Sequence, residues 1–138
     1  TFEFCHGCLT CGSESVHNKN IIMRHIKVNS GYNLLWLKMR PDTPQIYEYI
    51  TLEDIRGQIF NFININPWTQ FYDNKGCADI PASIARHIII RKSTCTCNVF
   101  RNIKEAPEQY TLADIQIDDN IIEEIGTPSD KTKHTGAE

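Results

Sequence analysis

Residues 50–64 read ITLEDIRGQIFNFIN, and this stretch decides the predicted fold class. Its apolar side chains recur three or four positions apart, at Leu52, Ile55, Ile59, Phe62 and Ile63. On a helical wheel they fall within an arc of about 100°. Thr51 is a suitable N-cap, Asp54 answers it from the third helical position, and Pro67 ends the pattern. The sequence therefore predicts an amphipathic helix over residues 51–64.

Apolar and polar residues alternate on both sides of that helix, which predicts β-strands. Residues 21–39 are expected to form a hairpin, because the NSG sequence between two apolar runs supplies a turn with a glycine. Residues 46–50 and 88–100 are expected to add further strands. The predicted fold is α+β: an antiparallel β-sheet, made of the hairpin 21–39 and strands near 46–50 and 88–100, packed on the helix 51–64.

The later part of the chain gives weaker signals. IPASIARHI (80–88) is interpreted as a short helix and IIEEIG (121–126) as a last helical turn, whereas YTLADIQI (110–117) fits either a helix start or a strand. QYTLADI (109–115) resembles YITLEDI (49–55). We interpret the two as similar helix caps and not as an internal repeat, because the flanking residues do not match.

Length and composition favour a single globular domain over residues 1–126, followed by a polar tail over 127–138. The chain has 138 residues, of which 41% are hydrophobic and 22% charged, close to globular averages. Its apolar runs are too short for a membrane span. Twenty Ile and eleven Asn suggest an AT-rich coding sequence, and on that association we predict a virus-encoded protein.

The cysteines cluster at both ends of the domain. CLTCGS (8–13) resembles a zinc knuckle, in which two thiolates three residues apart hold one ion and the following glycine lets the backbone curl. CTC (95–97) places two sulfurs on one face of a strand. The sequence therefore predicts a structural zinc ion in a tetrahedral site formed by Cys8, Cys11, Cys95 and Cys97, with Cys5, His6 and Cys77 as possible additional ligands.

Three other interpretations of the cysteines stay open. Three disulfides joining the early cysteines to the late ones would each contribute about 2–4 kcal/mol and would suit a secreted or surface domain, whereas bound zinc would suit an intracellular one. An iron–sulfur site would use the C-x2-C-x2-C run at 5–11, but Ser15 stands where a fourth cysteine would be expected. The thiols could also simply be free and buried.

A basic strip surrounds the CTC motif. Residues 84–104 carry five basic side chains and no acidic one, whereas 105–138 carry two basic and nine acidic side chains. The candidate nucleic-acid contacts are Arg86, Arg91, Lys92, Phe100 and Arg101, with Phe100 stacking on a base. The alternative is that this strip pairs with the acidic C-terminal segment of the same fold.

Three aromatic residues, Trp68, Phe71 and Tyr72, lie in a stretch that the prolines and glycine mark as a loop. They are expected either to anchor a protein partner or to fold back as a lid on the core.

No sequence motif of a catalytic or nucleotide-binding site occurs, whether G-x-S-x-G, a P-loop, a dinucleotide fingerprint or H-E-x-x-H. The predicted function is therefore a non-enzymatic protein-interaction domain stabilised by structural zinc. The alternatives are a secreted or surface-exposed disulfide-bonded binding module and a zinc-dependent nucleic-acid-binding domain.

Overall fold

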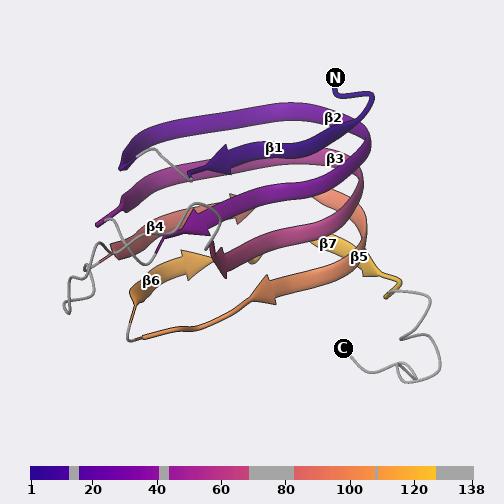
Figure 1. The fold of residues 1–138 in the computed structure, drawn as a ribbon. Helices are drawn as coiled ribbons and strands as arrows, with labels where there is room; N and C mark the ends of the chain where they lie inside the picture. The colour runs from indigo at the N-terminus through magenta and orange to yellow at the C-terminus, as the bar shows by residue number, and fades with distance from the viewer. Residues whose placement is uncertain (13–15, 41–43, 69–82, 108, 127–138) are drawn as a thin grey trace.

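The chain winds as a parallel β-solenoid. The computed structural model describes residues 1–12, 16–40, 44–68, 83–107 and 109–126, and none of them is helical. The strands are β1 (Cys5–Cys11), β2 (His17–Met39), β3 (Ile46–Pro67), β4 (Ser83–Arg91), β5 (Thr94–Ile103), β6 (Tyr110–Gln116) and β7 (Ile121–Glu124). All of their pairings are parallel. Figure 1 shows that β2 and β3 curve back so that the two halves of each strand face one another.

We call one turn of the solenoid a coil; the successive coils are β2, β3, β4 with β5, and β6 with β7. Equivalent residues of successive coils lie opposite each other and form columns along the solenoid axis. One column consists of an isoleucine from each coil: Ile21, Ile50, Ile88 and Ile115. Ile50 and Ile88, in the two middle coils, are fully buried. Burying one such side chain contributes about 1.5–3 kcal/mol. The abundance of isoleucine therefore has a structural role, because β-branched side chains pack well on neighbouring strands.

Two corners bend each coil, and at both of them a residue other than glycine has a positive φ. The first corner is formed by Asn20, Tyr49, His87 and Asp114, and the second by His25, Asp54, Lys92 and Asp119. Their φ angles lie between 55° and 60°. This left-handed conformation costs a residue with a Cβ about 1–2 kcal/mol, so packing between coils must hold the corners in place.

The predicted helix over 51–64 is wrong, because these residues belong to β3. Leu52 and Ile55 are three residues apart since the corner at Asp54 resets the alternation of the strand. Ile55 and Ile59 are four residues apart because the inward position between them is Gly57, which has no side chain. Its neighbours in the same column, Val28 and Cys95, are buried. A strand with a corner and a glycine in an inward position thus imitates the apolar spacing of a helix.

The predicted antiparallel arrangement is also wrong. Residues 21–39 lie in the single strand β2, and the NSG sequence marks a register shift between Val28 and Gly31 instead of a hairpin turn. The strands expected at 46–50 and 88–100 do exist, within β3 and within β4 and β5, but they pair in parallel. A bulge and a turn share the same glycine signal, which explains the error.

The short helices expected later in the chain are strands as well. Residues 83–88 lie in β4, and 121–124 form β7. The strand interpretation of YTLADIQI is confirmed over Tyr110–Gln116. The segment 127–138, predicted as a polar tail, lies outside the described residues.

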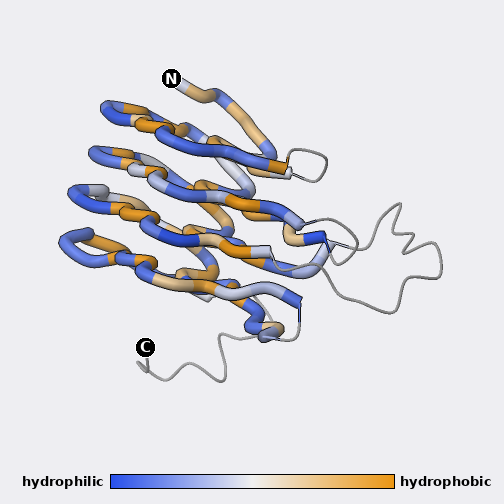
Figure 2. The backbone as a smooth tube through the Cα atoms, turned by 90° about the vertical axis from the view of Figure 1, so that its left-hand side faces the viewer, coloured by the Kyte–Doolittle hydropathy of each residue, from blue (hydrophilic) through white to orange (hydrophobic). Residues whose placement is uncertain are grey.

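The core lies between the two halves of the coils. Figure 2 shows hydrophobic and hydrophilic residues interspersed along each of the stacked coils. At the bend between the halves, the amides of Asn61 and Asn64 each donate a hydrogen bond to the side-chain oxygen of Asn33, over 3.0 and 2.9 Å. Asn33 in turn donates to the carbonyl of His6. Buried amides at the bend are thus connected from coil to coil.

In the described part of the chain, no helix has the length and apolarity to cross a bilayer.

Candidate functional site

The cysteines predicted as zinc ligands lie on two separate strands. Cys8 and Cys11 are in β1, and Cys95 and Cys97 are in β5. The order of pairing is β1, β2, β3, β5, so three steps of about 4.8 Å, or about 14 Å, separate the two strands. Tetrahedral thiolate ligands lie about 2.3 Å from a zinc ion. The structure therefore does not bring the four sulfurs to one point.

Of the additional candidate ligands that the structure describes, Cys5 contacts another cysteine. Its sulfur lies 3.5 Å from the sulfur of Cys8. The His6 ring packs edge-on against Phe4. Cys77 lies outside the described residues. Among the residues that the structure describes, no three His, Cys, Asp or Glu side chains gather as a metal site would require.

Burial makes the inner thiols poor nucleophiles. Desolvation raises the pKa of Cys11 to about 12 and that of Cys95 to about 11. It also raises the pKa of Cys97 to about 12, to which the charge of Glu124 adds. The pKa of Cys8 is raised as well, by burial first and then by Cys5. Because the thiolate is the reactive form, the buried thiols of Cys11, Cys95 and Cys97 are expected to react slowly at neutral pH.

The basic side chains of β4 pair with carboxylates of the preceding coil. The guanidinium of Arg86 donates to Glu48 over 2.9 Å, and that of Arg91 donates to Glu53 over 2.8 Å. The hydrogen bond from His17, followed by that from Arg86, lowers the pKa of Glu48, and the one from Arg91 lowers that of Glu53. Both pairs stabilise the stacking of coils, and the partners come from β3, not from the acidic C-terminal segment that the sequence suggested.

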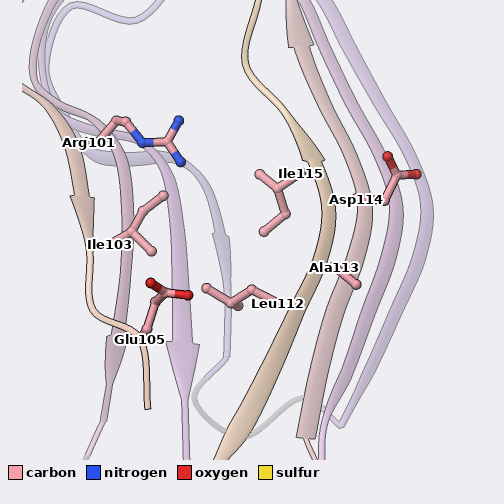
Figure 3. A pocket seen from close by; sticks show the side chains of 7 residues that line it. All are labelled: Arg101, Ile103, Glu105, Leu112, Ala113, Asp114 and Ile115. Carbon is pink, nitrogen blue, oxygen red and sulfur yellow. The ribbon is translucent and has the colours of Figure 1, made fainter. Parts of the chain in front are cut away.

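The other three predicted nucleic-acid contacts are spread over the fold. Lys92 forms the second corner of its coil. The Phe100 ring packs on Phe62, with 5.4 Å between ring centroids. Arg101 lies at the last coil, beside Ile103 (Figure 3). Lys92 directly follows Arg91, and its charge also lowers the pKa of Glu53, whereas Phe100 and Arg101 belong to β5.

Trp68 packs back on the solenoid. Its ring lies edge-on to that of Trp36, with 5.6 Å between centroids, and the ammonium of Lys38 lies 4.3 Å from both rings. Trp36 and Lys38 are half-buried and do not belong to the core, so the choice between a partner anchor and a lid on the core stays a prediction. Phe71 and Tyr72, the other two residues of that prediction, lie outside the described residues.

An exposed aromatic strip runs along the outer face at the bend. We define it as Phe4, His6, Tyr32, Phe60 and Ile125. The rings of Tyr32 and Phe60 are stacked, with 5.0 Å between their centroids, and their planes are nearly parallel, at an angle of 4°. Phe4 is 65% exposed. A shallow groove of about 250 Å³ follows the strip, and none of the described residues that line it is charged.

A second groove follows the outer face of the first corners. It has a volume of about 400 Å³ and is lined by Asn20, Ile22, Tyr49, Thr51, His87, Ile89 and Asp114. Tyr49 stacks on the imidazole of His87, whose Nδ1 lies 2.7 Å from a carboxylate oxygen of Asp114. Because its two ionisable side chains, His87 and Asp114, already pair with one another, this groove is less suited to a partner than the aromatic strip.

Sequence reasoning missed the aromatic strip because its members come from separate coils. A signal was present in the corner repeat, which reads NIIMRHI (20–26), YITLEDI (49–55), HIIIRKS (87–93) and DIQIDDN (114–120). In each copy an isoleucine follows the first corner and the second corner comes five residues after the first. Aligning these copies gives an offset of 29 residues, which places Tyr32 opposite Asn61; Tyr32 lies opposite Phe60 only because the register shift between Val28 and Gly31 reduces the offset to 28. The similarity between 49–55 and 109–115 concealed the repeat, because Tyr49 lies in the column of Asp114 and not of Gln109.

No family model, no curated protein and no solved structure matches this chain.

Proposed function

We propose that this protein is a non-enzymatic protein-interaction domain that binds an extended, uncharged segment of a partner along the aromatic strip. The observation that supports this proposal is the stack of Tyr32 on Phe60 on the outer face. Tyr32 is 47% exposed although its ring already packs on a neighbour. Aromatic side chains held rigidly at a surface are typical anchors of protein interfaces, because they bury a large area at little cost in conformational entropy.

The groove beside the strip suggests the chemistry of the partner. Its lining combines aromatic and aliphatic side chains with neutral hydrogen-bonding groups from Ser30, Gln58, Thr96 and Asn98. Charged peptides and phosphates would find no counter-charge in this lining, whereas an apolar extended segment could bury side chains against the rings and use the neutral groups for its backbone. The partner segment is therefore expected to be neutral and rich in aliphatic or aromatic residues.

The non-enzymatic character of the proposal is supported by the state of the reactive groups. The buried thiols have raised pKa values, and three imidazoles pair with carboxylates: His17 with Glu48, His25 with Asp54 and His87 with Asp114. The interaction role does not require zinc. Among the described residues no four cysteine sulfurs come together as the predicted zinc site would require. Whether the protein binds zinc is tested separately below.

The test is selection of binding peptides followed by substitution in the strip. Peptides from a random library that bind the wild-type chain should bind Tyr32→Ala at least about tenfold more weakly, since an aromatic anchor contributes more than about 1.4 kcal/mol. Tyr49→Ala is the matched control, because Tyr49 is 49% exposed and also stacked, but on the other groove. Equal binding by wild type and Tyr32→Ala, or selective loss in Tyr49→Ala, would refute the aromatic strip as the site.

A further inference from the structure

The two ends of the described solenoid are incomplete in complementary ways. At the N-terminal end β1 covers only the second half of β2, so over His17–Ile26 β2 has a strand neighbour only on its β3 side. At the other end β6 and β7 cover β4 and the start of β5, so over Val99–Ile103 β5 has a strand neighbour only on its β3 side. Both statements concern the described residues. Strand edges of this kind can accept another strand.

The register shows that one end fits the other. Gly7 and Val99 occupy the same column, because Gly7 lies opposite Asn33, Asn33 opposite Asn61, and Asn61 opposite Val99. His17 and Thr111 likewise share a column, through Ile46 and Ile84. The β6–β7 segment of one copy and the β1 strand of another would therefore make up one complete coil between two molecules.

Charge alternates from coil to coil along two outer columns at the second corner. The first column holds Arg24, Glu53, Arg91 and Asp118, and the second holds His25, Asp54, Lys92 and Asp119. Contacts between neighbouring coils include Arg91 with Glu53 at 2.8 Å and His25 with Asp54 at 2.7 Å. Opposite charges directly across two strands are favourable, and like charges are unfavourable.

Because the number of coils in these columns is even, the two ends carry opposite charge. Residues 16–28 contain five basic or histidine side chains and no acidic one. Residues 109–126 contain five acidic side chains and no basic one. Stacking a second copy on the last coil would place Arg24 of that copy opposite Asp118 and its His25 opposite Asp119. The alternation seen inside the chain would then continue across the junction.

The last coil also leaves the apolar interior open. A cavity of about 350 Å³ lies there between β5 and β6, and Figure 3 shows Ile103 on one side with Leu112 and Ile115 facing it from the other. By register, Ile115 shares its column with Ile21 and Ile103 shares its column with Cys11. A stacked copy would cover this interior with the side chains that already fill the same columns in the upper coils.

We propose that copies of this chain stack head to tail, the acidic last coil of one on the basic first coil of the next. This contact is heterologous, so it can continue into an open-ended assembly. Two local pairings compete with it. Phe2 forms a bridge to Val28 in the column that Ile122 of the other copy would enter, and Cys5 lies opposite Gly31 in the column that Glu124 would enter. Stacking exchanges the pairing of Phe2 and Cys5, including the two backbone hydrogen bonds of Phe2, for the pairing of two strand edges.

The test is sedimentation velocity of the full chain over a concentration series. The wild type should form oligomers that grow with concentration and dissociate at high salt, because the ends attract by charge. Arg24→Asp and Asp118→Arg should each weaken association at least about tenfold, which corresponds to about 1.4 kcal/mol. Mixing these two variants should restore association, because the unaltered last coil of the first fits the unaltered first coil of the second.

Arg56→Asp is the matched control, because Arg56 is exposed but lies on β3, which has a neighbour on both sides. It should associate as the wild type does. Circular dichroism melts establish that each variant is folded, and Arg24→Gln replaces Arg24→Asp if the latter is not. A wild type that stays monomeric throughout, or variants that fail to associate when mixed, would overturn the proposal. Sedimentation without peptide and peptide binding by Tyr32→Ala are separate measurements, so the failure of one proposal is distinguishable from the failure of the other.

Discussion

The Nδ1 atom of His25 lies 2.7 Å from a carboxylate oxygen of Asp54, although 29 residues separate them in the chain. Both residues have a left-handed backbone, with φ of 59° and 56°, and both form the second corner of their coil. The hydrogen bond from His25 is the largest cause of the lowered pKa of Asp54. Equivalent positions in consecutive coils therefore carry interacting charges, which couples the corners to one another.

Stability is expected to fall in acid because the paired carboxylates have lowered pKa values. Those of Glu48, Glu53, Asp54 and Asp114 are all shifted downward by hydrogen bonds from neighbouring side chains. A group whose pKa is lower in the folded state stabilises the fold above its unfolded pKa, and this contribution is lost as the pH falls through the folded pKa. Urea unfolding at a series of pH values should show stability declining below about pH 4.5.

The variant Glu53→Gln identifies the source of that decline. It removes one carboxylate, so its free energy of unfolding should fall less steeply in acid than that of the wild type. If the free energy of unfolding falls equally steeply with pH in both proteins, the pair of Glu53 with Arg91 does not contribute to the acid-dependent loss of stability.

Gly57→Ala should destabilise the protein by more than about 2 kcal/mol. Gly57 has a φ of 143°, and a Cβ there would lie 1.8 Å from the carbonyl oxygen of Val28. Backbone of the adjacent coil cannot yield without breaking the sheet. Thermal and urea unfolding measure the effect.

Gly31→Ala is the control for that substitution. A Cβ at Gly31 would lie 2.9 Å from the end of the Ile59 side chain, which can move. It should cost clearly less than Gly57→Ala, and the reverse order would argue against the close approach of β3 to β2 at Val28.

Ile50→Ala should cost about 2–5 kcal/mol, because it leaves a cavity in the middle of the isoleucine column. The same change at Ile22, which is 60% exposed, should alter stability by less than about 0.5 kcal/mol. Urea unfolding of both variants makes the comparison. Similar costs at the two positions would contradict the assignment of Ile50 to the inner face and of Ile22 to the outer face of the solenoid.

Chelation should leave the protein unchanged in mass and in melting temperature. Strand β1, which carries Cys8 and Cys11, is three sheet spacings, or about 14 Å, from β5, which carries Cys95 and Cys97, so the four thiolates cannot share one ion without unpairing β1. Native mass spectrometry with and without a chelator gives the mass, and circular dichroism gives the melting temperature. Loss of one zinc ion together with a lower melting temperature would show that β1 is placed differently.

Mild oxidation should link Cys5 to Cys8 before any other pair, because their sulfurs are 3.5 Å apart and both side chains are only half-buried. Peptide mapping of the oxidised chain identifies the link. A bond from either residue to Cys95 or Cys97 would support the disulfide interpretation of the sequence instead.

Part of this architecture could be predicted from local patterns. The strands at 46–50 and within 88–100 were correct, since alternation of apolar and polar residues is a property of the strand itself. The helix at 51–64 was wrong, since a left-handed corner at Asp54 and a glycine at position 57 shift the alternation to a spacing of three and four. Corners formed by histidine, aspartate, tyrosine and lysine carry no glycine to reveal them.

The candidate sites depended still more on tertiary structure. The zinc prediction used spacing within each cysteine cluster, but whether two clusters meet is decided by strand order, which spacing does not encode. The aromatic strip combines residues whose separation in the chain is set by the lengths of the connections between coils.

By itself, the sequence determined which residues alternate along each strand, and it carried the corner repeat from 20–26 to 114–120. Its basic first copy and acidic last copy were likewise fixed by composition. Only the tertiary structure decided that the strands run parallel and in register, since each strand finds its partners among residues far along the chain. That stacking turns isolated charges into alternating columns and separate aromatic residues into one exposed surface.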